Sequence, residues 1–195
     1  MNTPNKLTLF RILLVPFFVL LLLLSFPHHY LIAGLVFGIA SLTDLIDGKL
    51  ARKNNQITDF GKFADPLADK ILVISAFVCF VQLGITGAVP VIILLFREFA
   101  VTSVRLLAAA GGKVVAANIW GKLKTVSQIV AVVAVMLFHY LLELAEMYSF
   151  PSQNMQALTD TVYIIDNVFI WISVVLALIS GVIYLKENSE FLKAK

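Results

Sequence analysis

Apolar residues are grouped in six stretches along the chain, separated by short polar segments. Each stretch is close to the ~20 residues that an α-helix needs to cross the ~30 Å hydrocarbon core of a bilayer. A backbone in lipid must pair its own polar groups, so isolated stretches of this length favour helices. The sequence therefore predicts an all-α, polytopic membrane protein with six transmembrane helices, at Leu7–Phe26, Tyr30–Asp47, Phe63–Leu83, Val89–Ala110, Val126–Leu144 and Val162–Leu185.

Composition agrees with lipid as the main environment of the chain. Hydrophobic residues occupy 60% of the 195 positions and charged residues only 14%, whereas soluble domains carry about 25% charged residues. No composition break, repeat or long linker divides the sequence, so we expect residues 1–195 to form a single integral membrane domain. The longest polar insert, Met147–Asp160, is predicted to be an exposed loop.

The lysine and arginine residues of the predicted loops all lie on one side of the bundle. With six spans, both termini share a side, and the loops on that side carry Arg52, Lys53, Lys62, Lys113, Lys122 and Lys124. The three loops on the opposite side contain neither residue type. Cytoplasmic loops of membrane proteins are enriched in these residues, so the asymmetry predicts that both termini are cytoplasmic.

Four aspartates lie where the second stretch ends and the third begins. Asp44 and Asp47 are three residues apart, and Asp65 and Asp69 are four apart, so each pair shares one face of a helix. The short turn at Lys53–Gly61 makes the two helices antiparallel neighbours. The four carboxylates are therefore expected to meet near the cytoplasmic boundary.

Carboxylates at such close range repel one another, and an aspartate inside a membrane helix costs roughly 2.5–3.5 kcal/mol. Mg²⁺ or Mn²⁺ compensates this charge well, because these cations prefer carboxylate, water and phosphate oxygens. Two ions about 3.5–4 Å apart would stabilise a displacement at phosphorus. The sequence thus predicts a phosphate-handling metal centre. Ion pairs with Lys49, Lys62 or Lys70 are the structural alternative.

The same region carries the pattern D-x2-D-G-x2-A-R-x8-G-x3-D-x3-D from Asp44 to Asp69, with every fixed position matched. In this pattern the chain resembles the CDP-alcohol phosphatidyltransferases. The resemblance implies a six-helix fold and a homodimer in the bacterial inner membrane, with a cytoplasmic active site. It also implies transfer of a phosphatidyl group from CDP-diacylglycerol to an alcohol, with release of CMP.

The resemblance further implies roles for individual residues. Asp69 would act as the general base and also as a metal ligand. The full set of metal ligands would be Asp44, Asp47, Asp65 and Asp69. The CDP pocket would be lined by Gly48, Ala51, Arg52 and Gly61.

Asn5, Thr8 and Arg11 recur every three residues in the first stretch and share one helical face. This face either closes over the nucleotide, which would add the three residues to the CDP-binding set, or forms a capped helix start with a snorkelling arginine. The spacing alone leaves both interpretations open.

Arg97 lies inside an apolar stretch, where an unpaired arginine is costly. Arg105 follows two turns later on the same face, and Lys124 on the next helix completes a basic pocket that opens toward the aspartates. Arginine forks bind phosphate oxygens well, so these three residues are predicted to bind a phosphate on the acceptor alcohol. This segment, with Pro4–Arg11, resembles the branch of the family whose acceptor is sn-glycerol 3-phosphate.

Other functions stay open at this stage. Within the family, the acceptor could instead be an inositol phosphate, or the enzyme a cardiolipin synthase. A divalent-cation transporter would also need membrane aspartates, although it would be expected to hold them near the midplane. A structural scaffold is the third class. Membrane lipid is an expected partner, and nucleic acid is not.

Overall fold

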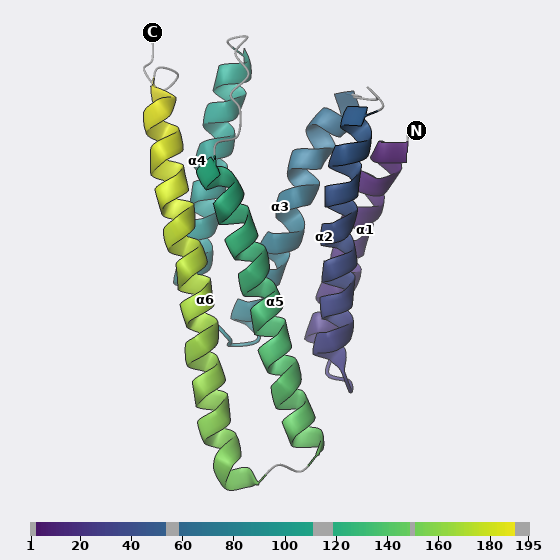
Figure 1. The fold of residues 1–195 in the computed structure, drawn as a ribbon, viewed down its shortest axis with the longest axis vertical. Helices are drawn as coiled ribbons and strands as arrows, with labels where there is room; N and C mark the ends of the chain where they lie inside the picture. The colour runs from purple at the N-terminus through teal and green to yellow at the C-terminus, as the bar shows by residue number, and fades with distance from the viewer. Residues whose placement is uncertain (1–2, 54–58, 111–118, 149–150, 190–195) are drawn as a thin grey trace.

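A computed structural model gives the backbone of residues 3–53, 59–110, 119–148 and 151–189. It describes the side chains in these ranges except at residues 3–7, 44–53, 59–67, 69, 110 and 152–153. The described backbone forms six α-helices and no β-strand. The helices are α1 (Thr3–Leu23), α2 (His29–Lys53), α3 (Asp59–Gln82), α4 (Ala88–Ala110), α5 (Ile119–Met147) and α6 (Ser152–Glu187), as Figure 1 shows.

Each apolar stretch of the sequence corresponds to one helix, so the predicted all-α class is confirmed. Within the described residues, α5 and the part of α6 from Asn154 to Glu187 are long and apolar enough to cross a membrane. The described parts of α1, α2 and α3 contain shorter apolar segments, at Thr8–Leu23, His29–Thr43 and Lys70–Gln82.

The prediction of an exposed loop at Met147–Asp160 is wrong in its secondary structure, because α6 already begins at Ser152. Residues 154–160 are mostly exposed, as their polarity indicated, but they are helical. No proline or glycine interrupts this segment, and Gln156 Nε2 donates to Asp160 Oδ1 one turn later at 2.9 Å. The polar composition therefore indicated exposure rather than irregular backbone.

The helices run alternately up and down, so that the first residues of α1 and the last of α6 lie at the same end of the molecule (Figure 1). The end of α2, the start of α3 and the end of α4 lie at this end too. Helix α1 packs against α2 and α3, whereas α6 packs against α4 and α5, and α2 and α5 join the two groups.

Large apolar side chains fill the space between the helices. Phe18, Phe37, Phe80 and Ile170 are completely buried there. The outward faces are also apolar, with Phe96 75% exposed and many other leucines, valines and isoleucines at the surface. A helix bundle that is apolar both inside and outside suits lipid rather than water.

A partly buried polar pair joins α5 and α6 toward the end opposite the termini. His139 Nε2 lies 3.0 Å from Asp166 Oδ2, and Asp166 is completely buried. The ring of Tyr30, on α2, packs against His139 with ring centroids 5.1 Å apart. Burying a carboxylate is costly unless it is paired, so this contact stabilises the packing of α5 against α6.

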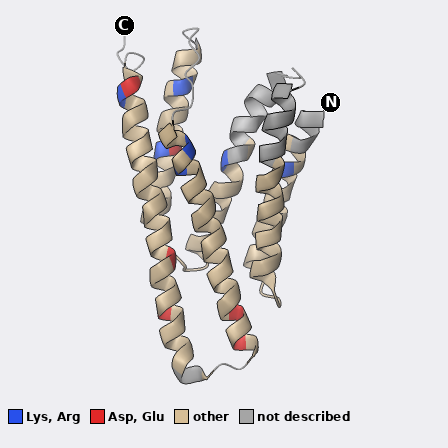
Figure 2. Ribbon diagram, viewed as in Figure 1, with Lys and Arg blue, Asp and Glu red and all other residues tan. Residues whose placement is uncertain are grey.

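Charge is distributed unevenly along the long axis of the molecule. Among the described residues, Figure 2 shows lysine and arginine gathered toward the end where α1 starts and α6 ends. Of the charged residues that the structure describes, those toward the opposite end are all acidic. The sequence-derived charge asymmetry therefore corresponds to two spatially separate ends.

Candidate active site

A cavity of about 730 Å³ lies among the helices in the basic half of the molecule. All six helices contribute to its lining, from Arg11 on α1 to Tyr184 on α6. Among the described lining residues, the only carboxylate is that of Glu98. The basic lining residues are Arg11, Lys70, Arg97, Arg105, Lys122 and Lys124. Such an excess of positive charge suits an anionic ligand.

The cavity borders the helical segments that carry the aspartates. Ala68 and Lys70, which precede and follow Asp69 in α3, both line it, as do Ser41 and Leu42 in α2. The backbone therefore brings the start of α3 to the same cavity as the basic residues of α4 and α5.

Most of the predicted metal and nucleotide residues lie outside the described side chains. Helices α2 and α3 carry the aspartates, which fall in the predicted helical segments. The structure describes no side chain for Asp44, Asp47, Asp65, Asp69, Asn5, Gly48, Ala51, Arg52 or Gly61. Their roles stay predictions. Among the described side chains, no group of three or more potential metal ligands is found.

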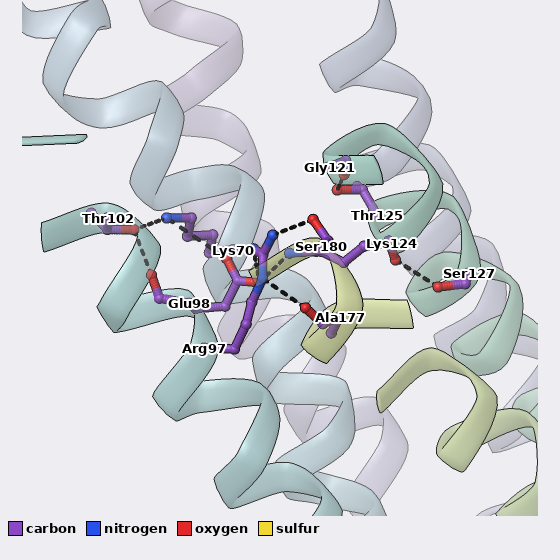
Figure 3. Close-up of polar contacts among 10 residues, drawn as sticks. All are labelled: Lys70, Arg97, Glu98, Thr102, Gly121, Lys124, Thr125, Ser127, Ala177 and Ser180. Atoms are coloured by element: carbon purple, nitrogen blue, oxygen red, sulfur yellow. Dashed lines mark hydrogen bonds and ion pairs between the residues drawn. The ribbon is translucent and has the colours of Figure 1, made fainter. Parts of the chain in front are cut away.

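Glu98 is the centre of a buried ionic cluster (Figure 3). Its Oε1 atom accepts from Nη1 of Arg97 at 3.1 Å and from Nζ of Lys124 on α5. Its Oε2 atom lies 3.8 Å from Nζ of Lys70 on α3, which also contacts Oγ1 of Thr102. One carboxylate thus joins three helices, and it compensates cations that the apolar surroundings would otherwise disfavour.

The Glu98–Arg97 contact shows that adjacent residues on a helix can pair when both side chains bend toward the same space. Glu98 directly follows Arg97 in α4, so the two side chains leave the helix in different directions. In the structure, the carboxylate reaches both Arg97 and Lys124.

Arg97 also holds α4 against α6. Its Nε atom donates to the carbonyl oxygen of Ala177 at 3.2 Å, and its Nη2 atom donates to Oγ of Ser180 at 2.7 Å. A Cβ atom at Gly181 would lie only 3.0 Å from Cγ of Arg97, so the arginine stem fits because this position is glycine. With the bond to Glu98, three of the five N–H groups of the guanidinium are used.

The three residues predicted to bind the acceptor phosphate line the same cavity. Arg97 and Lys124 are buried, at 8% and 7% exposure, and both contact Glu98. Arg105 is exposed and lines the cavity two turns along α4 from Arg97. The buried Arg97 and Lys124 thus offer cationic hydrogen-bond donors inside the cavity, and the exposed Arg105 offers them where the cavity meets solvent. Phosphate binding by these residues remains a prediction.

The described part of the N-terminal polar face is turned inward. Thr8 is 1% exposed and Arg11 is 2% exposed, and Arg11 lines the cavity. This burial disfavours a snorkelling arginine, which would place its head in water.

Sequence reasoning missed several polar residues of this region. Glu98 had a detectable signal, because a buried carboxylate in a membrane helix needs a cationic partner such as Arg97 or Lys124. Ser180 had none, because a serine in an apolar helix is common and its contact to Arg97 depends on the packing of α4 against α6. Gln128, which is 6% exposed and lines the cavity, was also missed.

Comparisons with known proteins agree with this architecture. The family model described as CDP-alcohol phosphatidyltransferase matches residues 1–179. The CDP-diacylglycerol–glycerol-3-phosphate 3-phosphatidyltransferase of Bacillus subtilis (strain 168) is 42% identical over 204 aligned positions, covering 98% of this chain and 97% of the relative. The proteins of the same name from Haemophilus influenzae and Pseudomonas fluorescens are 42% and 39% identical, covering 67% and 68% of this chain and 72% and 71% of the relatives. The chain therefore belongs to the CDP-alcohol phosphatidyltransferase family.

Proposed function

We propose that this membrane protein transfers the phosphatidyl group of CDP-diacylglycerol to sn-glycerol 3-phosphate, giving phosphatidylglycerophosphate and CMP. The relative from Bacillus subtilis, similar over nearly the whole chain, carries the name of this activity. The structural observation that carries the proposal is the basic cavity beside Asp69. It offers several cationic side chains to an acceptor that bears its own phosphate.

The family uses a divalent metal ion. The donor set suits such an ion, because Asp44, Asp47, Asp65 and Asp69 supply only carboxylate oxygens from two neighbouring helices. These four residues would hold two ions, Mg²⁺ or Mn²⁺. When bound, the ions would neutralise the diphosphate of CDP-diacylglycerol and the charge on the departing CMP.

The residues of the chain supply the remaining steps of the mechanism. Arg97, Arg105 and Lys124 hold the phosphate of glycerol 3-phosphate, which leaves its primary hydroxyl near Asp69. Asp69 takes the proton of this hydroxyl as the oxygen bonds to the lipid-side phosphorus. The bond from that phosphorus to the CMP oxygen breaks. Arg11 and Thr8, with Asn5, Gly48, Ala51, Arg52 and Gly61, enclose the CDP group.

The topology that fits this mechanism has six transmembrane helices, with both termini and the active site in the cytoplasm of a bacterial cell. The basic end of the molecule supports it, because positively charged ends of membrane proteins remain inside. Glycerol 3-phosphate and CMP are soluble and charged, and they exchange directly with the cytoplasm in this orientation. The protein would act as a homodimer within the inner membrane.

The function is tested with purified protein, CDP-diacylglycerol, Mg²⁺ and a panel of labelled acceptors. We expect label from glycerol 3-phosphate to enter lipid with equimolar release of CMP. Inositol phosphate and phosphatidylglycerol should give no lipid product above background. Chelation by EDTA should stop the reaction, and excess Mg²⁺ or Mn²⁺ should restore it. Transfer to a different acceptor instead would show that the assignment of glycerol 3-phosphate is wrong. CMP release that EDTA does not affect would contradict the metal centre.

Substitution of Arg105 by alanine is expected to weaken the binding of glycerol 3-phosphate far more than the binding of CDP-diacylglycerol. Loss of a charged hydrogen bond to phosphate costs about 1.5–3 kcal/mol, so the KM for glycerol 3-phosphate should rise about 10–100-fold. The KM for CDP-diacylglycerol should stay within about twofold, because that substrate binds elsewhere in the cavity. Steady-state kinetics with each substrate varied in turn measure both values.

Lys186→Ala is the matched control for this variant, because Lys186 is an exposed cation near the same end and outside the cavity. It should change neither KM. Equal increases in both KM values for Arg105→Ala would count against the acceptor pocket.

A further inference from the structure

Gln128 is a buried polar residue that the mechanism above does not use. It lies on α5 one turn after Lys124, on the same face of the helix and about 6 Å farther along its axis. Its side chain lines the cavity while the residue is only 6% exposed. The helix therefore places an amide directly beyond the basic cluster.

This amide has no partner among the residues that the structure describes. Every hydrogen bond between described side chains in this region involves other residues, such as those of the Glu98 cluster. The nitrogen and oxygen of the Gln128 amide are not fully enclosed by protein. The amide therefore still contacts the open space of the cavity. A buried amide of this kind is stabilised when a ligand supplies the missing hydrogen bonds.

The surroundings of Gln128 indicate what kind of group it can bind. On the side of the cavity away from the basic end, the lining is largely apolar, with Phe77 on α3, Leu94 on α4 and Val133 on α5. A neutral amide among apolar residues is poorly suited to a phosphate, which is served by the cations nearby. It is well suited to a hydroxyl group, because the amide both donates and accepts a hydrogen bond.

Glycerol 3-phosphate has one hydroxyl that the mechanism leaves unexplained. Its phosphate is assigned to the basic residues and its primary hydroxyl to Asp69. The secondary hydroxyl, on the middle carbon, projects sideways from the line between them. Without a partner, it would lose its hydrogen bonds to water on entering the cavity.

We propose that Gln128 binds the secondary hydroxyl of the acceptor, and so selects glycerol 3-phosphate over phosphoalcohols that lack this group. The inference rests on the proposed function, since it concerns the same cavity and acceptor. It assigns Gln128 to substrate specificity and leaves phosphate binding to the cations.

The test combines one variant with one substrate analogue. Gln128→Met replaces the amide by an apolar side chain of similar length, and 3-hydroxypropyl phosphate is the acceptor without the secondary hydroxyl. For the unaltered protein, we expect kcat/KM to be about 100-fold or more higher with glycerol 3-phosphate than with the analogue. For Gln128→Met, kcat/KM should fall about 100-fold with glycerol 3-phosphate and stay within about threefold with the analogue.

Gln156→Met is the matched control, because it makes the same chemical change on an exposed part of α6 outside the cavity. It should leave kcat/KM unchanged with both acceptors. Equal losses with both acceptors for Gln128→Met would show a structural role and overturn the inference.

The unaltered protein provides an independent measurement if Gln128→Met does not fold. Equal use of the two acceptors by that protein would also overturn the inference while leaving the proposed function intact. Failure of the unaltered protein to use glycerol 3-phosphate at all would instead overturn the proposed function.

Discussion

Asp69→Asn is expected to stop product formation while the protein still binds CDP-diacylglycerol in the presence of Mg²⁺. The amide keeps the size of the carboxylate but cannot take the proton of the attacking hydroxyl. A positioned general base contributes about 10²–10⁴-fold to a rate, so kcat should fall by at least about 100-fold. CMP release and binding of a labelled CDP-lipid, measured on the same folded sample, separate the two effects.

Two further variants make this result specific to the base. Asp65→Ala removes a metal ligand completely, so it should weaken metal-dependent lipid binding as well as turnover, whereas the amide oxygen of Asp69→Asn can still coordinate the ion. Asp160→Asn changes an exposed carboxylate at the far end of the molecule and should alter neither. Normal turnover by Asp69→Asn would end the assignment of Asp69 as the base.

Glu98→Ala is expected to cause the largest loss of stability among single substitutions in the cavity. Arg97 and Lys124 are both buried and both bind the same carboxylate oxygen. Removing one partner of a buried ion pair costs about 3–5 kcal/mol, because the remaining charge is left uncompensated. Equilibrium unfolding in detergent micelles measures the change in the free energy of unfolding.

The stability loss should depend on the charges that are left behind. Glu98→Gln combined with Lys124→Gln removes one cation with the carboxylate, and it should be less destabilising than the sum of the two single variants. Glu146→Ala removes an exposed carboxylate at the other end of α5 and should have little effect. Additive effects for the double variant would show that Glu98 and Lys124 are not energetically coupled.

The all-α fold was largely predictable because long apolar stretches favour helices. All six predicted stretches became helices in the described residues. The error at Met147–Asp160 arose because polar residues indicate contact with water and not the backbone conformation. Helix α6 includes the polar residues from Ser152 onward. Proline is the residue that most strongly interrupts a helix, and the only proline in this segment, Pro151, precedes α6 rather than interrupting it.

A candidate site was easiest to predict from residues that are close in sequence. The aspartate pattern spans one helical hairpin, so its spacing predicted a metal centre, which stays a prediction. The partners of Arg97 on α6, Ala177 and Ser180, are about eighty residues away and carry no distinctive signal. The position of Gln128 beside the cavity likewise depends on how α3, α4 and α5 pack together, which no local pattern specifies.

The close fit of Arg97 against Gly181 has a consequence for how this protein can evolve. The arginine stem occupies the volume that any larger residue at position 181 would need. A lineage that gains a side chain there must shift or replace the arginine, or adjust the packing of α4 against α6. Position 181 is therefore constrained by residue 97: a larger residue at 181 is accommodated most easily after Arg97 has been replaced by a smaller side chain.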